Sequence, residues 1–371
     1  MTERLARLCL AAVAEPGHPA LSEALTEFDA EEVWAGLLDS DAGSGIAARA
    51  RRLDPEQLVA RTRETGQRFV MPGDPEWPQF LSELDHCESV HQLAGVPIGL
   101  WVRGRAELAA LTNTSVAIVG SRAASAYGEH VAADLSVELS EAGWTVISGG
   151  AYGIDAAAHR GALAGRTPTV AVLAGGLDQP YPGGHRSLFE RIVEKGLLVS
   201  ELPPGEHPTR VRFLARNRLI AALSKGTVLV EAAARSGARN TVSWASALHR
   251  PVMAVPGSIT SATSVTPHRL IREAEAVLVT GGAEVLEMVA PIKPLARGRA
   301  TATRRTDSLS PEELRVFEMV PGRGSVSVGD LAVRAALPLP ACLAALNRLA
   351  EEDFLRQDRN GSWRLPPREP Q

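Results

Sequence analysis

The sequence predicts an α/β protein whose core is a Rossmann-like, doubly wound parallel sheet. Over residues 112–290, short apolar runs typical of buried strands alternate with helical segments. Loops rich in glycine and hydroxyl side chains follow several of these runs, as in sheets that bind ligands where their strands end. The flanking regions lack this alternation, and we expect a small N-terminal helical domain and a C-terminal winged helix.

Residues 1–66 are expected to form the helical domain, because leucines recur there at helical spacing. Asp29 and Asp54 are predicted helix starts, and Pro55 occupies a first helical position. A helix-hairpin-helix or a sterile-alpha-motif-like module would fit this length, but neither signature is clean. Residues 67–111 are predicted to form a bridging segment that begins with a proline-rich turn.

In the core region, residues 112–290, strands and helices are expected to alternate along the chain. The predicted strands are Ser115–Val119, Trp144–Ser148, Thr169–Leu173, Leu197–Ser200, Thr227–Val230, Val252–Val255 and a short one at Val277–Val279. The predicted helices run up to Leu139, from Ile154, from His185, over Leu214–Ser224 and near Asn240–Leu248. A ligand site is expected in the loops that follow the strands.

The pattern changes after residue 290. Residues 291–306 place basic side chains among Pro, Gly, Ala and Thr, which predicts a flexible basic linker. Residues 307–366 then resume with a capped helix start at Ser310, two further helices and an Asn360-Gly361 hairpin signal. Three helices followed by a hairpin predict the winged-helix domain.

Composition excludes several classes of protein. The 371 residues are 45% hydrophobic and carry a net charge of -4, which argues against disorder and against a histone-like coating protein. The three cysteines show no disulfide framework and no zinc spacing, so we expect a reduced, cytoplasmic protein without a metal or cofactor. No apolar run reaches membrane-spanning length, so no membrane partner is expected.

The segment from 210 to 218 concentrates positive charge. Arg210, Arg212, Arg216 and Arg218 lie within nine residues, together with Phe213 and Asn217. Guanidinium groups match phosphate in a two-pronged geometry, so this segment predicts an anion site with one aromatic ring. Two alternatives stay open: the arginines form a solvated helix face, or Phe213 belongs to the core.

Three loops at predicted strand ends repeat the anion-binding theme. Their candidate binding residues are Gly120, Ser121 and Arg122, then Gly149, Gly150 and Asp155, then Arg235, Ser236, Gly237 and Thr241. Small loops at helix starts offer backbone N–H donors to phosphate, and glycine lets the backbone approach a ligand closely. Each loop also has a plain structural interpretation: a strand-to-helix turn, a helix cap for Asp155, and a structural role for His159. The GxGxxG dinucleotide fingerprint is absent.

Five segments together resemble the DNA-processing protein A family (DprA, also called Smf). The matching segments are Val116–Arg122, Ser148–Asp155 with Ala158–Leu163, Phe213–Ala221, Ser236–Thr241 and Val255–Ile259. The resemblance is strong over roughly residues 70–290 and weak over the two flanking domains. The chain departs from the family pattern at Tyr152, a position that is often basic.

The resemblance implies a protein that binds single-stranded DNA and loads the RecA recombinase onto it during natural transformation. It also implies a homodimer. By the same resemblance, Arg122, Arg216 and Arg218 contact phosphate and Phe213 stacks on a base. Arg210 stands where a basic residue is expected. Binding without sequence preference needs such a positive groove with stacking platforms.

Two other functions remain open. A nucleotide-binding phosphoribohydrolase-like enzyme uses the same type of sheet, but Pro182-Gly183-Gly184 matches only the start of its loop, and Glu231 has no evident partner acid. Asp155, His159 and Glu201 make no recognisable catalytic spacing. A sequence-specific duplex regulator needs a polar recognition helix, whereas residues 340–351 end in acid. We therefore predict a non-enzymatic mediator that binds single-stranded DNA.

Overall fold

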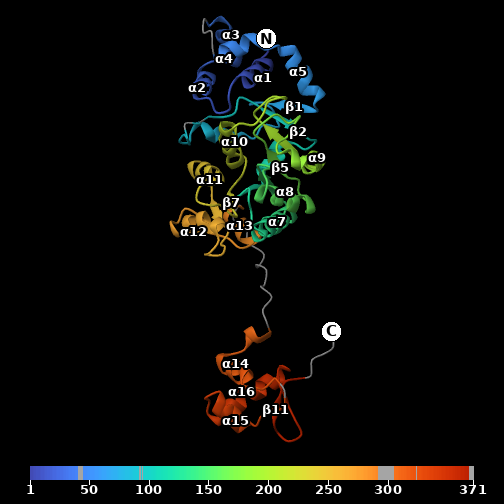
Figure 1. Ribbon diagram of the computed structural model, residues 1–371, viewed down its shortest axis with the longest axis vertical. Helices are drawn as coiled ribbons and strands as arrows, with labels where there is room; N and C mark the ends of the chain where they lie inside the picture. The colour runs from blue at the N-terminus through green and yellow to red at the C-terminus, as the bar shows by residue number, and fades with distance from the viewer. Residues whose placement is uncertain (41–44, 92, 94, 291–304, 323, 367–371) are drawn as a thin grey trace. The chain divides into compact units, whose positions relative to one another are not determined.

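The computed structural model describes residues 1–40, 45–91, 93, 95–290, 305–322 and 324–366. The chain divides into two compact units, Met1–Leu295 and Ala296–Gln371 (Figure 1). Among the described residues, the larger unit contains one nine-stranded sheet, and the smaller unit contains helices and a two-stranded hairpin. Each unit has a hydrophobic core of its own.

The order of strands across the sheet is β1-β2-β6-β5-β4-β3-β7-β8-β9. Their bounds are β1 Gln67–Val70, β2 Leu100–Arg103, β3 Ser115–Val119, β4 Thr145–Ser148, β5 Val170–Val172, β6 Leu197–Ser200, β7 Thr227–Leu229, β8 Val252–Ala254 and β9 Val277–Leu278. Neighbours from β6 to β9 pair in parallel. The predicted doubly wound α/β core is therefore confirmed. Strands β1 and β2 add an antiparallel edge that the sequence pattern did not predict.

Helices cover both faces of the sheet. They are α6 Leu108–Asn113, α7 Ala126–Glu141, α8 Ile154–Ala164, α9 Arg186–Lys195, α10 Arg210–Ala222, α11 Ala238–Ala247, α12 Val265–Arg272 and α13 Gly282–Val289, with the short 3-10 helix η1 at Gln79–Asp85. Successive side chains of a strand point to opposite faces. On β3, Val116 and Ile118 accordingly pack in the cluster that contains α7, α8 and α13, whereas Ala117 and Val119 pack with α10 and α11.

The N-terminal helices form the same compact unit as the sheet. They are α1 Glu3–Val13, α2 Pro19–Glu27, α3 Ala30–Asp39, α4 Ile46–Arg52 and α5 Pro55–Glu64. Asp29 caps α3 in a reciprocal box with Glu32, and Asp54 caps α5, as their sequence positions predict. Trp101 of β2 shares a hydrophobic cluster with α1 and α5 and donates a 3.3 Å hydrogen bond to Thr62.

The first described element of the smaller unit is the short 3-10 helix η4 at Arg305–Ser308. Helices α14 Pro311–Glu318, α15 Val328–Arg334 and α16 Leu339–Glu351 follow, and then the hairpin strands β10 Arg356–Gln357 and β11 Trp363–Arg364. This order of elements is compatible with a winged helix, which stays a prediction. The predicted basic linker lies almost wholly in residues 291–304, outside the described residues.

The described helices were also compared with the length and hydropathy of a membrane span. No single one of them is long and apolar enough to cross a membrane. The pair α15 and α16, bent by 108° between them, reaches the criterion by length and composition only.

Candidate nucleic-acid interface

The chain reverses its direction of travel across the sheet between β3 and β7. Strands β4 to β6 lie on one side of β3, and β7 to β9 lie on the other, so the loops after β3 and β7 meet at a crevice. Ser121 in the first loop donates its N–H to the carbonyl oxygen of Glu231 in the second, at 2.7 Å. This is the edge at which the sequence places its glycine-rich loops.

The loop after β4 packs against the loop after β3, at the same crevice. Ile154, the first residue of α8, donates its N–H to the carbonyl oxygen of Ser121 at 3.2 Å. Gly153 has a φ of +72°, and a Cβ built there would lie 2.3 Å from that same oxygen. Glycine is therefore required at 153 both by conformation and by the close approach of the two loops.

Arg122 and Phe213 form the centre of the candidate interface. Arg122 is exposed, makes no ion pair with any described residue, and holds its guanidinium carbon 4.6 Å from the centre of the Phe213 ring. Phe213 is only half-buried, in the first turns of α10. The alternative that Phe213 belongs to the core does not describe this position. The cation lies over the aromatic ring, and both groups reach solvent. Such a pair suits a ligand that carries phosphates and bases.

Arg216 is buried and joins the loops around this pair by hydrogen bonds. Its Nη1 donates to the carbonyl oxygens of Gly149 and Val172 at 2.5 and 2.6 Å, and the residue is only 6% exposed. Burial lowers the pKa of Arg216 to about 10, against the opposing effect of Asp155. A Cβ built on Gly149 would lie 2.1 Å from Nη1. The space at Gly149, which the sequence reserves for a ligand, is filled by this guanidinium.

Asp155 lies in the first turn of α8 beneath the same crevice. Burial raises the pKa of this carboxyl, while Arg216 and the N–H of Ala151 act in the opposite direction. The residue that caps α8 is Gly153, so Asp155 is not the cap that sequence reasoning left open. Its charged form would interact favourably with the Arg216 guanidinium.

The expectation that Arg218 contacts phosphate needs correction. The residue has no exposed surface, and its guanidinium forms a two-pronged ion pair with Glu201, at 2.6 Å for Nη2, and donates to the carbonyl oxygen of Gly95 at 3.2 Å. A phosphate has no surface of Arg218 to contact here. The residue is a core cation whose partner comes from the end of β6.

Arg212 is likewise engaged by protein groups. It donates to both carboxylate oxygens of Glu15 at 2.8 and 2.9 Å, and to Glu206 at 2.6 Å. The hydrogen bond with Glu15 raises the pKa of Arg212, and its guanidinium lowers the pKa of Glu15. Since Glu15 follows α1, this ion pair joins the N-terminal helices to α10.

The remaining predicted residues divide by exposure. Arg210, the first residue of α10, and Arg235, in the loop after β7, are exposed and form no ion pair with a described residue. Ser236 and Gly237 are in that same loop, at the start of α11. Asn217 and Thr241 are buried, and Asn217 donates to Asn240 at 3.2 Å. Gly120 and Gly150 lie within the packed loops of the crevice, where built Cβ atoms meet Ile154 and Phe189.

The acids and the histidine considered for catalysis each contact a partner within the protein. His159 is wholly buried, its Nδ1 lies 2.9 Å from the Thr169 hydroxyl, and burial lowers its pKa to about 3. The Glu231 carboxylate accepts from Ser125 and Thr263. Since Glu201 is paired with Arg218, each acid has a structural partner. Within the described ranges no group of three or more His, Cys, Asp and Glu side chains is placed to hold a metal.

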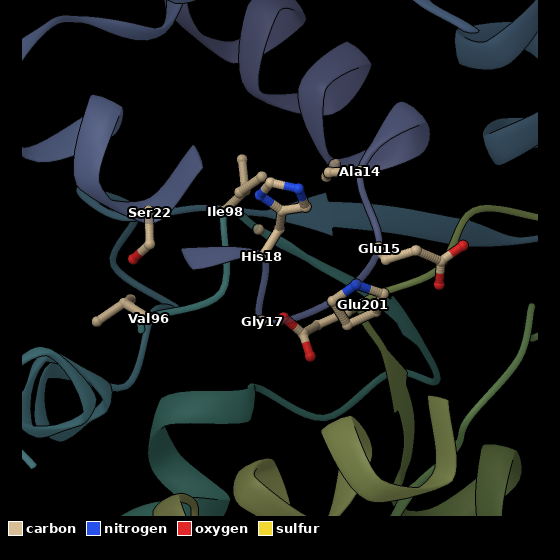
Figure 2. Close-up of a pocket in the computed structure, with 11 residues that line it drawn as sticks. Ala14, Glu15, Gly17, His18, Ser22, Val96, Ile98 and Glu201 are labelled. Atoms are coloured by element: carbon tan, nitrogen blue, oxygen red, sulfur yellow. The ribbon is translucent and has the colours of Figure 1, made fainter. Parts of the chain in front are cut away.

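Figure 2 shows a pocket beside Glu201, where the turn between α1 and α2 meets the core. Glu15, His18, Ser22 and Glu201 line it, and its volume is about 20 Å³. That is space for one water molecule, so the pocket does not take a nucleotide.

Two aromatic residues of the crevice loops were not among the predicted binding residues. Tyr181 meets Phe213 edge to face with ring centres 6.0 Å apart, and Tyr152 does the same with His185 at 4.5 Å. Both follow predicted strands, and Tyr152 also lies in the matching segment Ser148–Asp155.

Comparisons with known proteins can be set beside this geometry. Residues 68–290 match the family model described as DNA recombination-mediator protein A. A relative from Mycobacterium tuberculosis, provisionally named as a DNA processing protein DprA, is 43% identical over 341 residues, covering 91% of this chain and 86% of the relative. The solved DNA processing protein A of Streptococcus pneumoniae has a TM-score of 0.64 at 30% identity, covering 79% of this chain and 99% of its own. That of Helicobacter pylori, described with a single-stranded DNA binding mode, has a TM-score of 0.51 at 24% identity, covering 60% of this chain and 96% of its own.

Proposed function

This chain belongs to the DNA recombination-mediator protein A family, and from that premise we propose that it binds single-stranded DNA as a non-enzymatic mediator. One observation carries the proposal: the exposed Arg122 guanidinium lies against the half-buried Phe213 ring at the carboxyl edge of the sheet. The guanidinium supplies a phosphate contact and the ring supplies a stacking surface, which are the two components of sequence-tolerant strand binding.

Arg210, on the same helix as Phe213, and Arg235, in the loop after β7, add two further exposed positive charges. Neither is neutralised by a described carboxylate, so both are free to contact phosphate. Arg216 and Asp155 act by holding the loops, and Arg212 and Arg218 act within the protein. The DNA-binding set therefore reduces to Arg122, Arg210, Phe213 and Arg235.

The test is fluorescence anisotropy with labelled single- and double-stranded oligonucleotides across a salt series. We expect tighter binding to the single strand and a logarithmic salt slope that falls by about 0.7 for each phosphate contact removed, as in Arg122→Ala. Equal affinity for the single- and double-stranded oligonucleotides contradicts the proposal, and so does an unchanged salt slope in Arg122→Ala. Incubation with nucleoside monophosphates is expected to release no free base, whereas release would favour the phosphoribohydrolase-like alternative.

By resemblance to the family, we further propose that the chain loads RecA onto incoming single strands during natural transformation, in the cytoplasm and as a homodimer. The rate of RecA filament assembly on a labelled strand, with and without this protein, tests the first part. Sedimentation equilibrium tests the second. An unchanged assembly rate or a monomeric mass would remove the corresponding proposal.

A further inference from the structure

All three tyrosines of this chain lie at the carboxyl edge of the sheet. Tyr127, Tyr152 and Tyr181 follow β3, β4 and β5, and they are 48%, 48% and 51% exposed. Removing a large aromatic ring from water lowers the free energy. Half-exposed rings that gather on one rim therefore indicate a surface that a partner covers.

Tyr181 continues the aromatic surface of Phe213. The two ring centres are 6.0 Å apart at an interplanar angle of 63°. Phe213 also lies beneath the Arg122 guanidinium, so Tyr181, Phe213 and Arg122 form one contact series from the loop after β5 to the loop after β3.

Tyr152, in the loop after β4, packs against the segment that follows Tyr181. Its ring meets His185 edge to face at 4.5 Å, and His185 Nδ1 lies 3.1 Å from the carbonyl oxygen of Gly150. A Cβ built on Gly184 would lie 2.6 Å from the Tyr152 hydroxyl. These contacts hold the loop of Tyr152 against the segment that follows Tyr181, so neither ring projects from an isolated loop.

The charges beside these rings identify the partner. Arg122 and Arg210 are exposed and have no described acidic partner, so an anionic partner with flat apolar groups is favoured over an apolar protein surface. A single strand presents phosphates and bases together, and every base has a face that stacks. We propose that Tyr152 and Tyr181 are base-stacking residues that extend the single-stranded DNA site beyond Phe213. This inference rests on the function proposed above.

Two labelled strands of equal length, about 20 nucleotides each, test the inference: one of thymidines and one that is abasic throughout. Tyr181→Ala and Tyr152→Ala are each expected to raise the Kd for the thymidine strand about 5-fold or more, because one stacked base is lost. The Kd for the abasic strand and the salt slope are expected to stay unchanged, since no phosphate contact is removed. Tyr181→Phe and Tyr152→Phe keep the ring and should bind as the wild type does.

Phe28→Ala is the matched control, because Phe28 is 54% exposed and lies at the end of α2, in the N-terminal helices. This variant should leave both affinities unchanged. Wild-type affinity for the thymidine strand in both Tyr→Ala variants overturns the inference while the proposed function stands. Equal weakening on the two strands also overturns it. A wild-type protein that binds neither strand overturns the proposed function itself.

Discussion

We predict that Arg218→Ala destabilises the larger unit, whereas Arg122→Ala changes binding alone. Arg218 has no exposed surface and is paired with Glu201, which is 7% exposed. Removing one partner of such a buried pair leaves the other charge desolvated and uncompensated, at a cost of about 3–5 kcal/mol. For the unit Met1–Leu295, an unfolding entropy of about 2.1 cal/mol/K per residue converts that cost into a fall in Tm of about 5–8 °C.

The assay is urea denaturation and thermal melting followed by circular dichroism, together with the anisotropy salt series on folded protein. Arg122→Ala should keep its Tm within about 1 °C, since surface substitutions change stability by about 0.5 kcal/mol or less. It should lose affinity and salt slope. A double variant, Arg218→Met with Glu201→Leu, replaces the pair by apolar side chains and should regain most of the lost stability.

The reasoning fails if Arg218→Ala has the same Tm as the wild type but binds single strands more weakly and with a reduced salt slope. That result would mean that Arg218 reaches phosphate, as the sequence pattern predicts. It also fails if the double variant is no more stable than Arg218→Ala.

Three further predictions concern the N-terminal helices, the crevice and the thiols. Arg212 lowers the pKa of Glu15 below its ordinary value of 4.5. The ion pair therefore contributes fully to folding stability above pH 4.5, and this contribution is lost as the pH falls through the lower pKa of the folded state. Between about pH 5 and pH 3 the wild-type Tm should fall more steeply than that of Glu15→Gln, and parallel curves would contradict this. Gly149→Ala should cost about 1–3 kcal/mol in urea denaturation, because its Cβ displaces the Arg216 guanidinium, whereas Gly36→Ala in open space on α3 should cost nothing; equal effects would refute the contact. Burial raises the pKa of Cys9 to about 11, and Cys9 and Cys342 are wholly buried, so a thiol reagent followed by mass spectrometry should label Cys87 first. Labelling of all three at one rate in native buffer would be incompatible with that burial.

The strands of the core were predictable because most of their residues are apolar. The start of α10 was not: the apolar run predicts Leu214, but the helix begins at Arg210, where the Thr209 side chain accepts from the N–H of Arg212. The first turn faces solvent, so hydrophobic spacing does not mark it. Strands β1 and β2 were missed because they pair antiparallel, outside the alternation of strands and helices, and because β1 begins with the polar residues Gln67 and Arg68.

The candidate site was predictable in outline. Arg122 and Phe213 lie together as expected, because both follow strands that end at the same edge. What the sequence does not reveal is which arginine is neutralised. Arg218 finds Glu201 and Arg212 finds Glu15 only after the chain has folded, and the second partner is 197 residues away. Charge clusters in a sequence therefore overstate the free charge at a surface.

Helix α10 passes from solvent into the core within its own length. Arg210 is exposed at its start, Phe213 is half-buried, and every residue from Ala215 to Ala222 is buried. The aromatic platform is thus anchored to a helix whose backbone opens only when the core opens, and its amides should exchange hydrogen as slowly as the most protected strands. Binding a strand then orders few protein groups, so little conformational entropy opposes association. A peptide of this helix alone would lose that preorganisation and most of the affinity with it.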